Sequence, residues 1–228
     1  MNIIITGASR GIGYELCKKF LQEHNVIAIS RSSDSFTKDE IFSNNSRFNH
    51  LSMDLSKTDF KKDLLPIVQE TFANVDIIIN NAGLLISKPI HELSDNDFDA
   101  LFNVNVKSAF RLIRDLLPII NSGGHIVNIS SMGGYQGSSK FPGLSLYSAS
   151  KGALSILSEC MAEEFKDLGI SSNALALGAV QTEMLNEAFP GYKAPLNANE
   201  MADFIYDFAI NGNKYFNGKV LPVSISTP

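Results

Sequence analysis

The sequence has no tryptophan, only two cysteines and no long hydrophobic run. Its apolar runs reach about four residues, whereas a helix that crosses a bilayer needs roughly 20. The first residues, MNIIITGASRGIG, also lack the basic region and long apolar core of a secretory signal. We therefore expect no membrane-spanning helix and no secretory signal, which predicts a cytoplasmic protein.

Cysteine and histidine are too scattered to indicate a cross-linked or metal-bound fold. Cys17 and Cys160 lie far apart in segments with helical patterns, and we expect both to be small buried side chains in a reducing compartment rather than a disulfide or a nucleophile. The four histidines form neither H-E-x-x-H nor a His/Cys cluster with metal-ligand spacing. The sequence therefore predicts no metal site.

Basic residues are not in excess, because 19 Lys and Arg stand against 24 Asp and Glu, giving a formal net charge of −5. The basic side chains are also scattered along the chain. A nucleic acid or an anionic membrane surface requires a dense basic patch. We therefore expect neither nucleic acid nor a membrane as a partner.

Short apolar, β-branched stretches alternate with longer amphipathic stretches along all 228 residues, 44% of which are hydrophobic. The expected strands are residues 2–6, 25–30, 48–54, 75–80, 125–130, 171–177 and 218–224. The expected helices are residues 11–23, 57–71, 95–119, 148–167 and 199–210. Strands that are apolar on both faces and separated by helices favour a parallel sheet covered on both sides. The sequence therefore predicts one doubly wound α/β domain of the Rossmann type over residues 1–228.

The segment TGASRGIG, residues 6–13 and here called the glycine loop, joins the first expected strand to the first helix. Its glycines, Gly7, Gly11 and Gly13, permit a tight turn and a close approach to a pyrophosphate, whose charge the free N–H groups at the helix start stabilise. The spacing departs from G-x-G-x-x-G, and a tight connection is the alternative. Its place between a strand and a helix favours a phosphate-binding loop.

A tyrosine and a lysine four residues apart on a helix can form an acid/base device, because the ammonium group stabilises the phenolate. Three such pairs occur: Tyr14 with Lys18, Tyr147 with Lys151, and Tyr215 with Lys219. The third pair spans an Asn-Gly turn signal, and the first is most simply an exposed pair on a helix. Only the second pair follows a strand that ends in serines, so Tyr147 and Lys151 are the candidates for proton transfer.

Three motifs in the same order resemble the short-chain dehydrogenase/reductase family over nearly the whole chain. They are the glycine loop, NNAG at residues 80–83 and YSASK at residues 147–151. The resemblance implies a hydride transfer between a nicotinamide cofactor and a carbonyl or alcohol group.

The resemblance also implies the roles of four catalytic residues. Ser131 would bind the substrate oxygen, although Ser130 adjoins it. Tyr147 would be the acid or base, and Lys151 would bind the ribose hydroxyls and lower the pKa of the tyrosine. Asn105, in VNVKSAF, matches the asparagine that holds a water in the family's proton relay.

NADP(H) is the expected cofactor. In the family, the second strand ends in an acidic residue when NAD is bound, whereas here Ser30 and Arg31 occupy that place and Arg10 lies in the glycine loop. Two guanidinium groups beside a missing carboxylate suit a 2′-phosphate, and the alternative is that both are solvated surface charges. Asp54 resembles an adenine contact or is a helix cap, and NNAG could be a plain turn. The implied cofactor-binding residues are Gly7, Ser9, Arg10, Gly11, Ile12, Gly13, Ser30, Arg31, Asp54, Leu55, Asn81, Ala82, Gly83, Tyr147, Lys151, Val180 and Thr182.

The chain departs from the family pattern in its C-terminal third. Leu177-Gly178 replaces the usual Pro-Gly, although Val180 and Thr182 still match the residues that hold the nicotinamide amide. VSIS at residues 223–226 replaces V-D-G-G, which puts in doubt the C-terminal contacts common in family tetramers.

Two loops are expected to shape a substrate pocket. Residues 132–146 form a longer connection than is usual in the family. Residues 183–195, here called the lid segment, carry apolar side chains among turn formers: Met184, Leu185, Phe189 and Tyr192. We expect a short mobile lid with an apolar wall, and the alternative is that these side chains pack on the body of the domain.

These observations predict an NADP(H)-dependent carbonyl reductase or alcohol dehydrogenase with a small-molecule substrate. The alternative is a non-catalytic NADP(H)-binding regulator that senses redox state, although such a protein has no use for the complete catalytic set.

We also expect a homodimer or homotetramer, because two helical segments are more apolar than one buried stripe requires. The apolar residues in question are Phe98, Leu101, Phe102, Val106, Phe110, Leu154, Leu157 and Met161.

Overall fold

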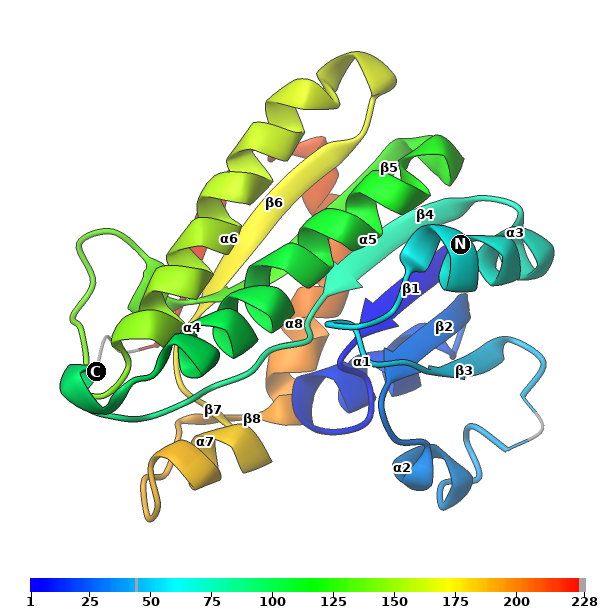
Figure 1. Ribbon diagram of the computed structural model, residues 1–228. Helices are drawn as coiled ribbons and strands as arrows, with labels where there is room; N and C mark the ends of the chain where they lie inside the picture. The colour runs from blue at the N-terminus through cyan, green and yellow to red at the C-terminus, as the bar shows by residue number, and fades with distance from the viewer. Residues whose placement is uncertain (44, 226–228) are drawn as a thin grey trace.

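A parallel sheet of seven strands runs through the centre of the computed structural model, which describes residues 1–43 and 45–225 (Figure 1). The strand order is β3-β2-β1-β4-β5-β6-β9. These strands are β1 (Asn2–Thr6), β2 (Asn25–Ser30), β3 (Phe48–Ser52), β4 (Val75–Asn80), β5 (Ile120–Ser131), β6 (Ser171–Leu177) and β9 (Val220–Val223). The doubly wound α/β fold expected from the sequence is confirmed, and residue 226 of the VSIS segment lies outside the described residues.

Helices cover both faces of this sheet. They are α1 (Gly11–Phe20), α2 (Asp34–Thr37), α3 (Leu65–Phe72), α4 (Asp95–Phe102), α5 (Ser108–Leu116), α6 (Ser145–Glu164), α7 (Glu183–Ala188) and α8 (Ala198–Asn211). Figure 1 shows α5 and α6 in front of the sheet and α8 behind it. A second, two-stranded sheet pairs β7 (Val180–Gln181) with β8 (Leu196–Asn197) beside α7.

Alternate residues of each central strand enter two different hydrophobic cores, because successive side chains of a strand point to opposite faces. On β1, Ile3 and Ile5 pack in the core that contains residues of α1 and α8. Ile4, between them, packs in the core that contains residues of α3, α5 and α6. All three isoleucines are fully buried, which explains why the strand is apolar at every position.

The helix boundaries differ from expectation where they bear on the site. The expected helix at residues 95–119 is helical throughout, but a π-helical turn at Asn103–Lys107 separates α4 from α5. α6 begins at Ser145, three residues before the expected start, so Tyr147 lies within its first turn. The elements α2, α7, β7 and β8 were not predicted from the sequence, because two to six residues are too few to show a periodic pattern.

The two cysteines differ in environment. Cys17 is fully buried on α1, as expected, whereas Cys160 is exposed. The expectation that both are buried is therefore wrong for Cys160. It lies on α6 next to Met161, which points into the core, and this one-residue step turns the thiol to the solvent side. None of the helices in the described part of the chain is long and apolar enough to cross a membrane.

Candidate active site

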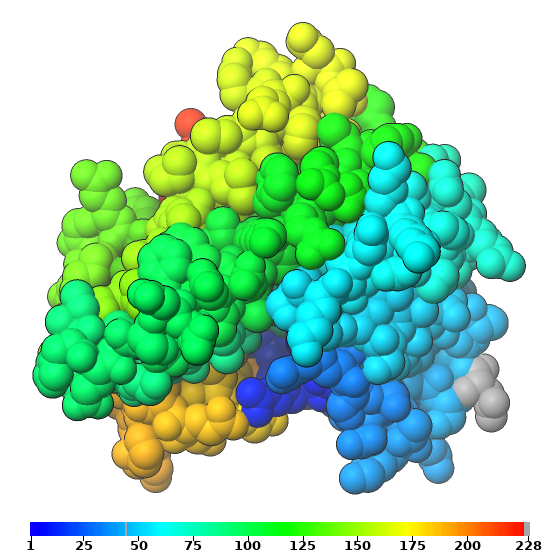
Figure 2. Space-filling model, in the orientation of Figure 1, coloured from blue at the N-terminus to red at the C-terminus, as the bar shows by residue number. Residues whose placement is uncertain are grey.

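A cavity of about 570 Å³ lies at the carboxyl ends of the central strands, where the strand order reverses between β1 and β4. Figure 2 shows the surface hollowed where the first, blue residues lie between the green, light-blue and orange segments. Ligands of open parallel sheets bind at such a reversal point. The cavity is lined by every residue expected to bind the cofactor except Gly13, and by every expected catalytic residue except Asn105.

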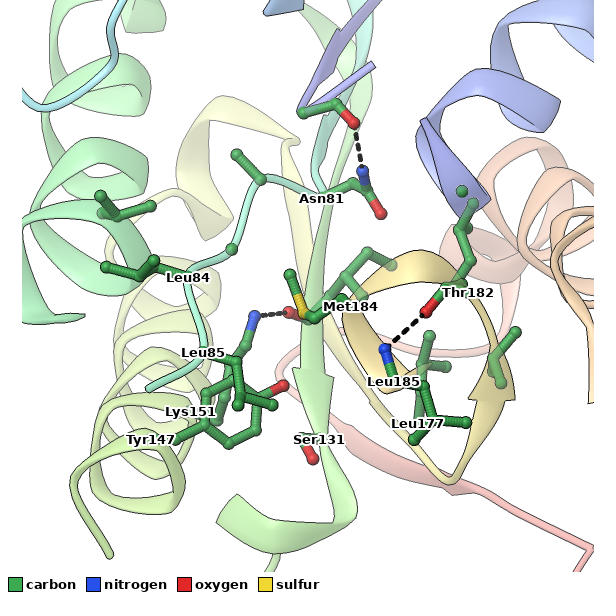
Figure 3. A pocket seen from close by; sticks show the side chains of 18 of the residues that line it. Asn81, Leu84, Leu85, Ser131, Tyr147, Lys151, Leu177, Thr182, Met184 and Leu185 are labelled. Carbon is green, nitrogen blue, oxygen red and sulfur yellow. Dashed lines mark hydrogen bonds between the residues drawn. The ribbon is translucent and has the colours of Figure 1, made fainter. Parts of the chain in front are cut away.

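Hydrogen bonds hold the glycine loop against the loop after β4. The Asn81 side-chain amide donates to the carbonyl oxygens of Thr6 and Gly7, at 3.1 Å each, and Figure 3 draws one of these bonds as a dashed line. The backbone N–H groups of Asn81 and Ala82 both donate to the Thr6 hydroxyl at 3.1 Å. Asn81 therefore positions the glycine loop, since both N–H bonds of its amide are used within the protein.

Two glycines of the loop are required by this close packing. Gly7 has a φ of +66°, and a Cβ there would lie 2.6 Å from Ala82 Cα. A Cβ on Gly13 would collide with the carbonyl oxygen of Gly7 and with the amide of Asn81. Gly13 does not line the cavity, because it lies in the contact between α1 and the loop.

The end of β2 carries no carboxylate. The Ser30 hydroxyl donates to Ser32 O at 2.8 Å and lies 2.8 Å from His50 Nε2. Because its proton is used on Ser32, this hydroxyl shapes the turn after β2, while the exposed Arg31 side chain lines the cavity. No local sequence motif marks His50 as the partner of Ser30. Arg10, in the glycine loop, also lines the cavity and pairs with Glu187 of α7 at 3.0 Å.

Asp54 lies in a turn of its own after β3. Its Oδ1 accepts hydrogen bonds from the Ser56 hydroxyl at 2.7 Å and from the Ser56 backbone N–H at 3.0 Å. The bond from the Ser56 hydroxyl is the main reason why the pKa of Asp54 lies below its ordinary value. A carboxylate in this state can still accept a further hydrogen bond at its second oxygen.

Glycine contacts also bring the end of β5 against α6. The turn at Met132–Gly134 packs on α6 so closely that a Cβ on Gly134 would lie 2.5 Å from the Gly152 nitrogen. This contact places Ser131 beside Tyr147 and Lys151. Figure 3 shows Tyr147 and Ser131 on the same side of the cavity, and all three residues line it.

Lys151 is buried, and its ammonium group donates to Ile129 O at 2.7 Å (Figure 3). Burial lowers the pKa of Lys151 to about 8. The nitrogen lies 6.0 Å from the centroid of the Tyr147 ring. Lys151 therefore remains mostly protonated at pH 7 and retains two further N–H groups for a ligand.

The pKa of Tyr147 is raised above its ordinary value by burial, and a hydrogen bond with Ser131 acts in the opposite direction. We expected the lysine to bring this pKa towards neutrality, but the largest effect in the protein alone is desolvation of the phenolate, which raises the pKa of Tyr147. At pH 7 the Tyr147 hydroxyl is therefore protonated and able to donate.

Asn105 lies behind the cavity, in the π-helical turn. Its Oδ1 accepts from Leu84 N at 2.7 Å, and its amide donates to Leu84 O and to Ser150 Oγ at 2.9 Å each. Ser150, a residue of YSASK to which no role was assigned from the sequence, donates to Tyr147 O at 2.7 Å. This chain of bonds connects the loop after β4 to the first turn of α6.

The two adjoining serines are in different environments. Ser130 is buried, and its hydroxyl donates to Lys151 O at 2.9 Å and accepts from Ser155 at 2.9 Å. Ser131 is partly exposed, and its Oγ accepts from Gly133 N at 3.2 Å. The Ser131 hydroxyl proton is therefore not needed for that bond.

The lid segment borders the cavity on the side opposite α6. Thr182 caps α7 by accepting from Leu185 N at 3.3 Å (Figure 3), and no residue of α7 is buried. The expected lid residues Met184, Leu185, Phe189 and Tyr192 all line the cavity. The Phe189 and Phe141 rings meet nearly edge to face, with centroids 6.3 Å apart. The lid segment and the loop at residues 132–146 thus contact each other over the cavity.

The other two tyrosine–lysine pairs lie outside this cavity. Tyr14 donates to Asp39 Oδ2 at 2.6 Å and stacks on Phe36, so the expectation of an exposed pair is wrong for this partly buried residue. Tyr215 is 78% exposed. Within the described residues, no group of three or more His, Cys, Asp or Glu side chains is arranged to hold a metal ion.

Curated relatives align with most of the chain. A fatty acyl-CoA reductase of Mycobacterium tuberculosis is 34% identical over 212 residues, which are 89% of this chain and 71% of the relative. A 3β-hydroxysteroid dehydrogenase of Mediterraneibacter gnavus is 30% identical over 187 residues, which are 80% of this chain and 67% of the relative.

Solved structures share the fold. The structure of ElxO with NADP bound superposes with a TM-score of 0.84 at 28% identity, covering 97% of this chain and 96% of ElxO. The sequence model described as short chain dehydrogenase matches residues 1–193. The chain therefore belongs to the short-chain dehydrogenase family of oxidoreductases, as the three motifs indicated.

Proposed function

We propose that this protein is an NADP(H)-dependent oxidoreductase that interconverts an apolar carbonyl compound and its alcohol. The observation that carries the proposal is the meeting of Ser131, Tyr147 and Lys151 in one cavity with the glycine loop and two arginines. These groups match the two requirements of the reaction, a site for a dinucleotide and a proton donor at the reacting oxygen.

The residues present fit a phosphorylated dinucleotide. The glycine loop lets a ligand approach the backbone at the start of α1, where free N–H groups favour a pyrophosphate. Arg31, which directly follows β2, and Arg10, in the glycine loop, both line the cavity, and Ser30 at the end of β2 replaces the carboxylate that would bind a ribose 2′-hydroxyl. Arginine forms bidentate hydrogen bonds with phosphate oxygens, and ElxO is a relative whose structure contains NADP. When bound, NADP(H) supplies the hydride donor or acceptor.

The side chains around the reacting oxygen have separate roles in this proposal. Tyr147 donates its hydroxyl proton to the carbonyl oxygen in reduction and accepts it back in oxidation. Ser131 donates a hydrogen bond to the same oxygen. Lys151 uses its two remaining N–H groups on the ribose hydroxyls, and its charge stabilises the phenolate that Tyr147 becomes. Asn105 and Ser150 hold the first turn of α6 in place through the Tyr147 carbonyl.

The substrate end of the cavity is apolar. Its walls include Leu84, Leu85, Met184, Phe189 and Tyr192, from the loop after β4 and from the lid segment. Such a wall favours a hydrophobic ketone, aldehyde or alcohol over a charged one, because a charge would lose its hydration there without a partner. Relatives named as a hydroxysteroid dehydrogenase and a fatty acyl-CoA reductase support an apolar substrate class.

The test is a screen for oxidation of NADPH and of NADH in the presence of oxoacyl thioesters, diketones, quinones and aldehydes. We expect at least one carbonyl class to be reduced, with a higher kcat/KM for NADPH than for NADH. Equal values for the two cofactors would contradict the assignment of NADP(H). Tight NADPH binding without reduction of any carbonyl class would instead support a non-catalytic redox-sensing regulator.

A further inference from the structure

Two carboxylates of the lid segment lie against the glycine loop. Glu187 Oε1 accepts from Arg10 Nη1 at 3.0 Å. A Cβ built on Gly11 would lie 3.5 Å from Glu183 Oε2 and 3.3 Å from Thr182 Cγ2, so the start of α7 packs directly on the start of α1. Glu183 and Glu187 are four residues apart, which places them on the same face of α7.

In this arrangement two anions can compete for Arg10: the Glu187 carboxylate and the 2′-phosphate of NADP(H). Its guanidinium group is one of the two at the proposed 2′-phosphate site, and a guanidinium binds a carboxylate or a phosphate with the same set of N–H groups. In the structure these groups face a carboxylate that belongs to the protein. We infer that Glu187 sets the degree of NADPH preference by competing with the 2′-phosphate for Arg10. This inference rests on the proposed function, because it requires the cofactor to occupy this cavity.

The exposure of the pair limits the size of the effect. The Arg10 and Glu187 side chains are 51% and 67% exposed. Ion pairs with this degree of exposure are weak, so removing Glu187 should tighten NADPH binding by roughly two- to fivefold. NADH lacks the 2′-phosphate, and its affinity should not change.

Glu183 offers an internal comparison. Its carboxylate lies beside Gly11, at the start of α1 where the pyrophosphate is expected. The pyrophosphate is common to both cofactors. Glu183→Gln should therefore change the NADPH and NADH affinities by the same factor, whereas Glu187→Gln should change only the first.

The experiment measures the Kd of NADPH and of NADH by titration calorimetry for the unaltered protein, Glu187→Gln, Arg10→Ala and the double variant. We expect Glu187→Gln to lower the Kd of NADPH alone and to have no effect in the Arg10→Ala background. Higher salt should reduce the gain, because exposed charges are screened. The charge control is Glu163→Gln, which removes an exposed carboxylate paired with Lys166 at 3.8 Å and should leave both Kd values unchanged.

Three results would overturn the inference. Weaker NADPH binding by Glu187→Gln would mean that Glu187 orients Arg10 for the phosphate. An equal gain for both cofactors, or a gain that persists without Arg10, would mean a general charge effect. If Glu187→Gln leaves the Kd of NADPH unchanged while the unaltered protein still prefers NADPH, this inference alone is overturned. If the unaltered protein has no preference for NADPH, the proposed cofactor is overturned as well.

Discussion

At the scale of single residues, Tyr147 is the side chain on which the proposed chemistry depends most directly. Tyr147→Phe should lower kcat by about 10²- to 10⁴-fold, because it removes the donated proton and leaves the ring in place. NADPH should still bind, because only the hydroxyl group is removed and Lys151 keeps its proposed contacts with the ribose. Stopped-flow or steady-state measurement of NADPH oxidation gives the first value, and titration gives the second.

Tyr215→Phe is the matched control for this variant, because Tyr215 has the same spacing to a lysine but is 78% exposed and outside the cavity. It should remain fully active. Turnover by Tyr147→Phe comparable to that of the control would refute the catalytic assignment.

At the scale of elements, the lid segment is predicted to act on the substrate and not on the cofactor. Replacing Phe189 and Tyr192 together by alanine should raise KM for the best carbonyl substrate by about tenfold, because the substrate loses apolar contact with both aromatic side chains. The Kd of NADPH should change little. Phe204→Ala on α8 is the control. Phe204 is 42% exposed, close to the 41% of Tyr192, and it lies outside the cavity.

The melting temperature of the lid variant decides between the two interpretations of this segment. Because Phe189 is only partly buried and Tyr192 is 41% exposed, we expect a melting temperature close to that of the unaltered protein. A clear loss of thermal stability with unchanged kinetics would mean that the lid segment is part of the packed body of the domain.

At the scale of the whole molecule, the exposed aromatic side chains on α4 and α5 favour a second copy of the chain as a partner. Phe98 is 44% exposed and stacks on Phe102, and Phe110 is 41% exposed. Three of the apolar residues from which an oligomer was expected are instead buried in the core and cannot contact a partner: Leu101, Leu154 and Met161. The case for an oligomer therefore rests on the exposed phenylalanines.

We expect a homodimer at micromolar concentration and a monomer after Phe98→Glu and Phe110→Glu are combined, because two charges would be buried without partners. Sedimentation velocity measures both states. Ile67→Glu, on α3 and 36% exposed, should leave the dimer intact. An unaltered protein that sediments as a monomer would remove the basis for this prediction.

The whole fold should also lose stability in mild acid through His125. This buried side chain bonds to Ala209 O at 2.9 Å and to the Asn173 amide at 3.0 Å, and burial lowers its pKa to about 4. Below pH 6.5 the unfolded chain binds a proton that the folded protein does not, so stability falls until the pH approaches 4. From pH 7 to pH 5 the loss from this residue is about 2 kcal/mol.

Urea unfolding at pH 7 and pH 5 measures this loss. His125→Gln has no group that titrates in this range, so its free energy of unfolding should fall less than that of the unaltered protein. Equal losses in the two proteins would show that other groups cause the acid sensitivity.

The sequence by itself determined the architecture and the location of the site. Alternating apolar and amphipathic stretches specify strands buried on both faces and the helices that cover them, because these periodicities are local properties of the chain. The glycine loop and YSASK could also be identified from the sequence, since the residues that define each motif lie within a few positions of one another. A parallel sheet then brings the carboxyl ends of its strands to one edge, so these motifs meet in one cavity.

Only the tertiary structure decided how individual side chains are used. Asn105 bonds to the loop after β4 and lies behind the cavity, and Ser30 directs its proton to its own turn. Arg10 pairs with Glu187, 177 positions further along the chain. No local pattern encodes such contacts, because they form only when folding brings distant segments within hydrogen-bond distance. Each buried polar group is then paired with a donor or acceptor that the fold has placed next to it.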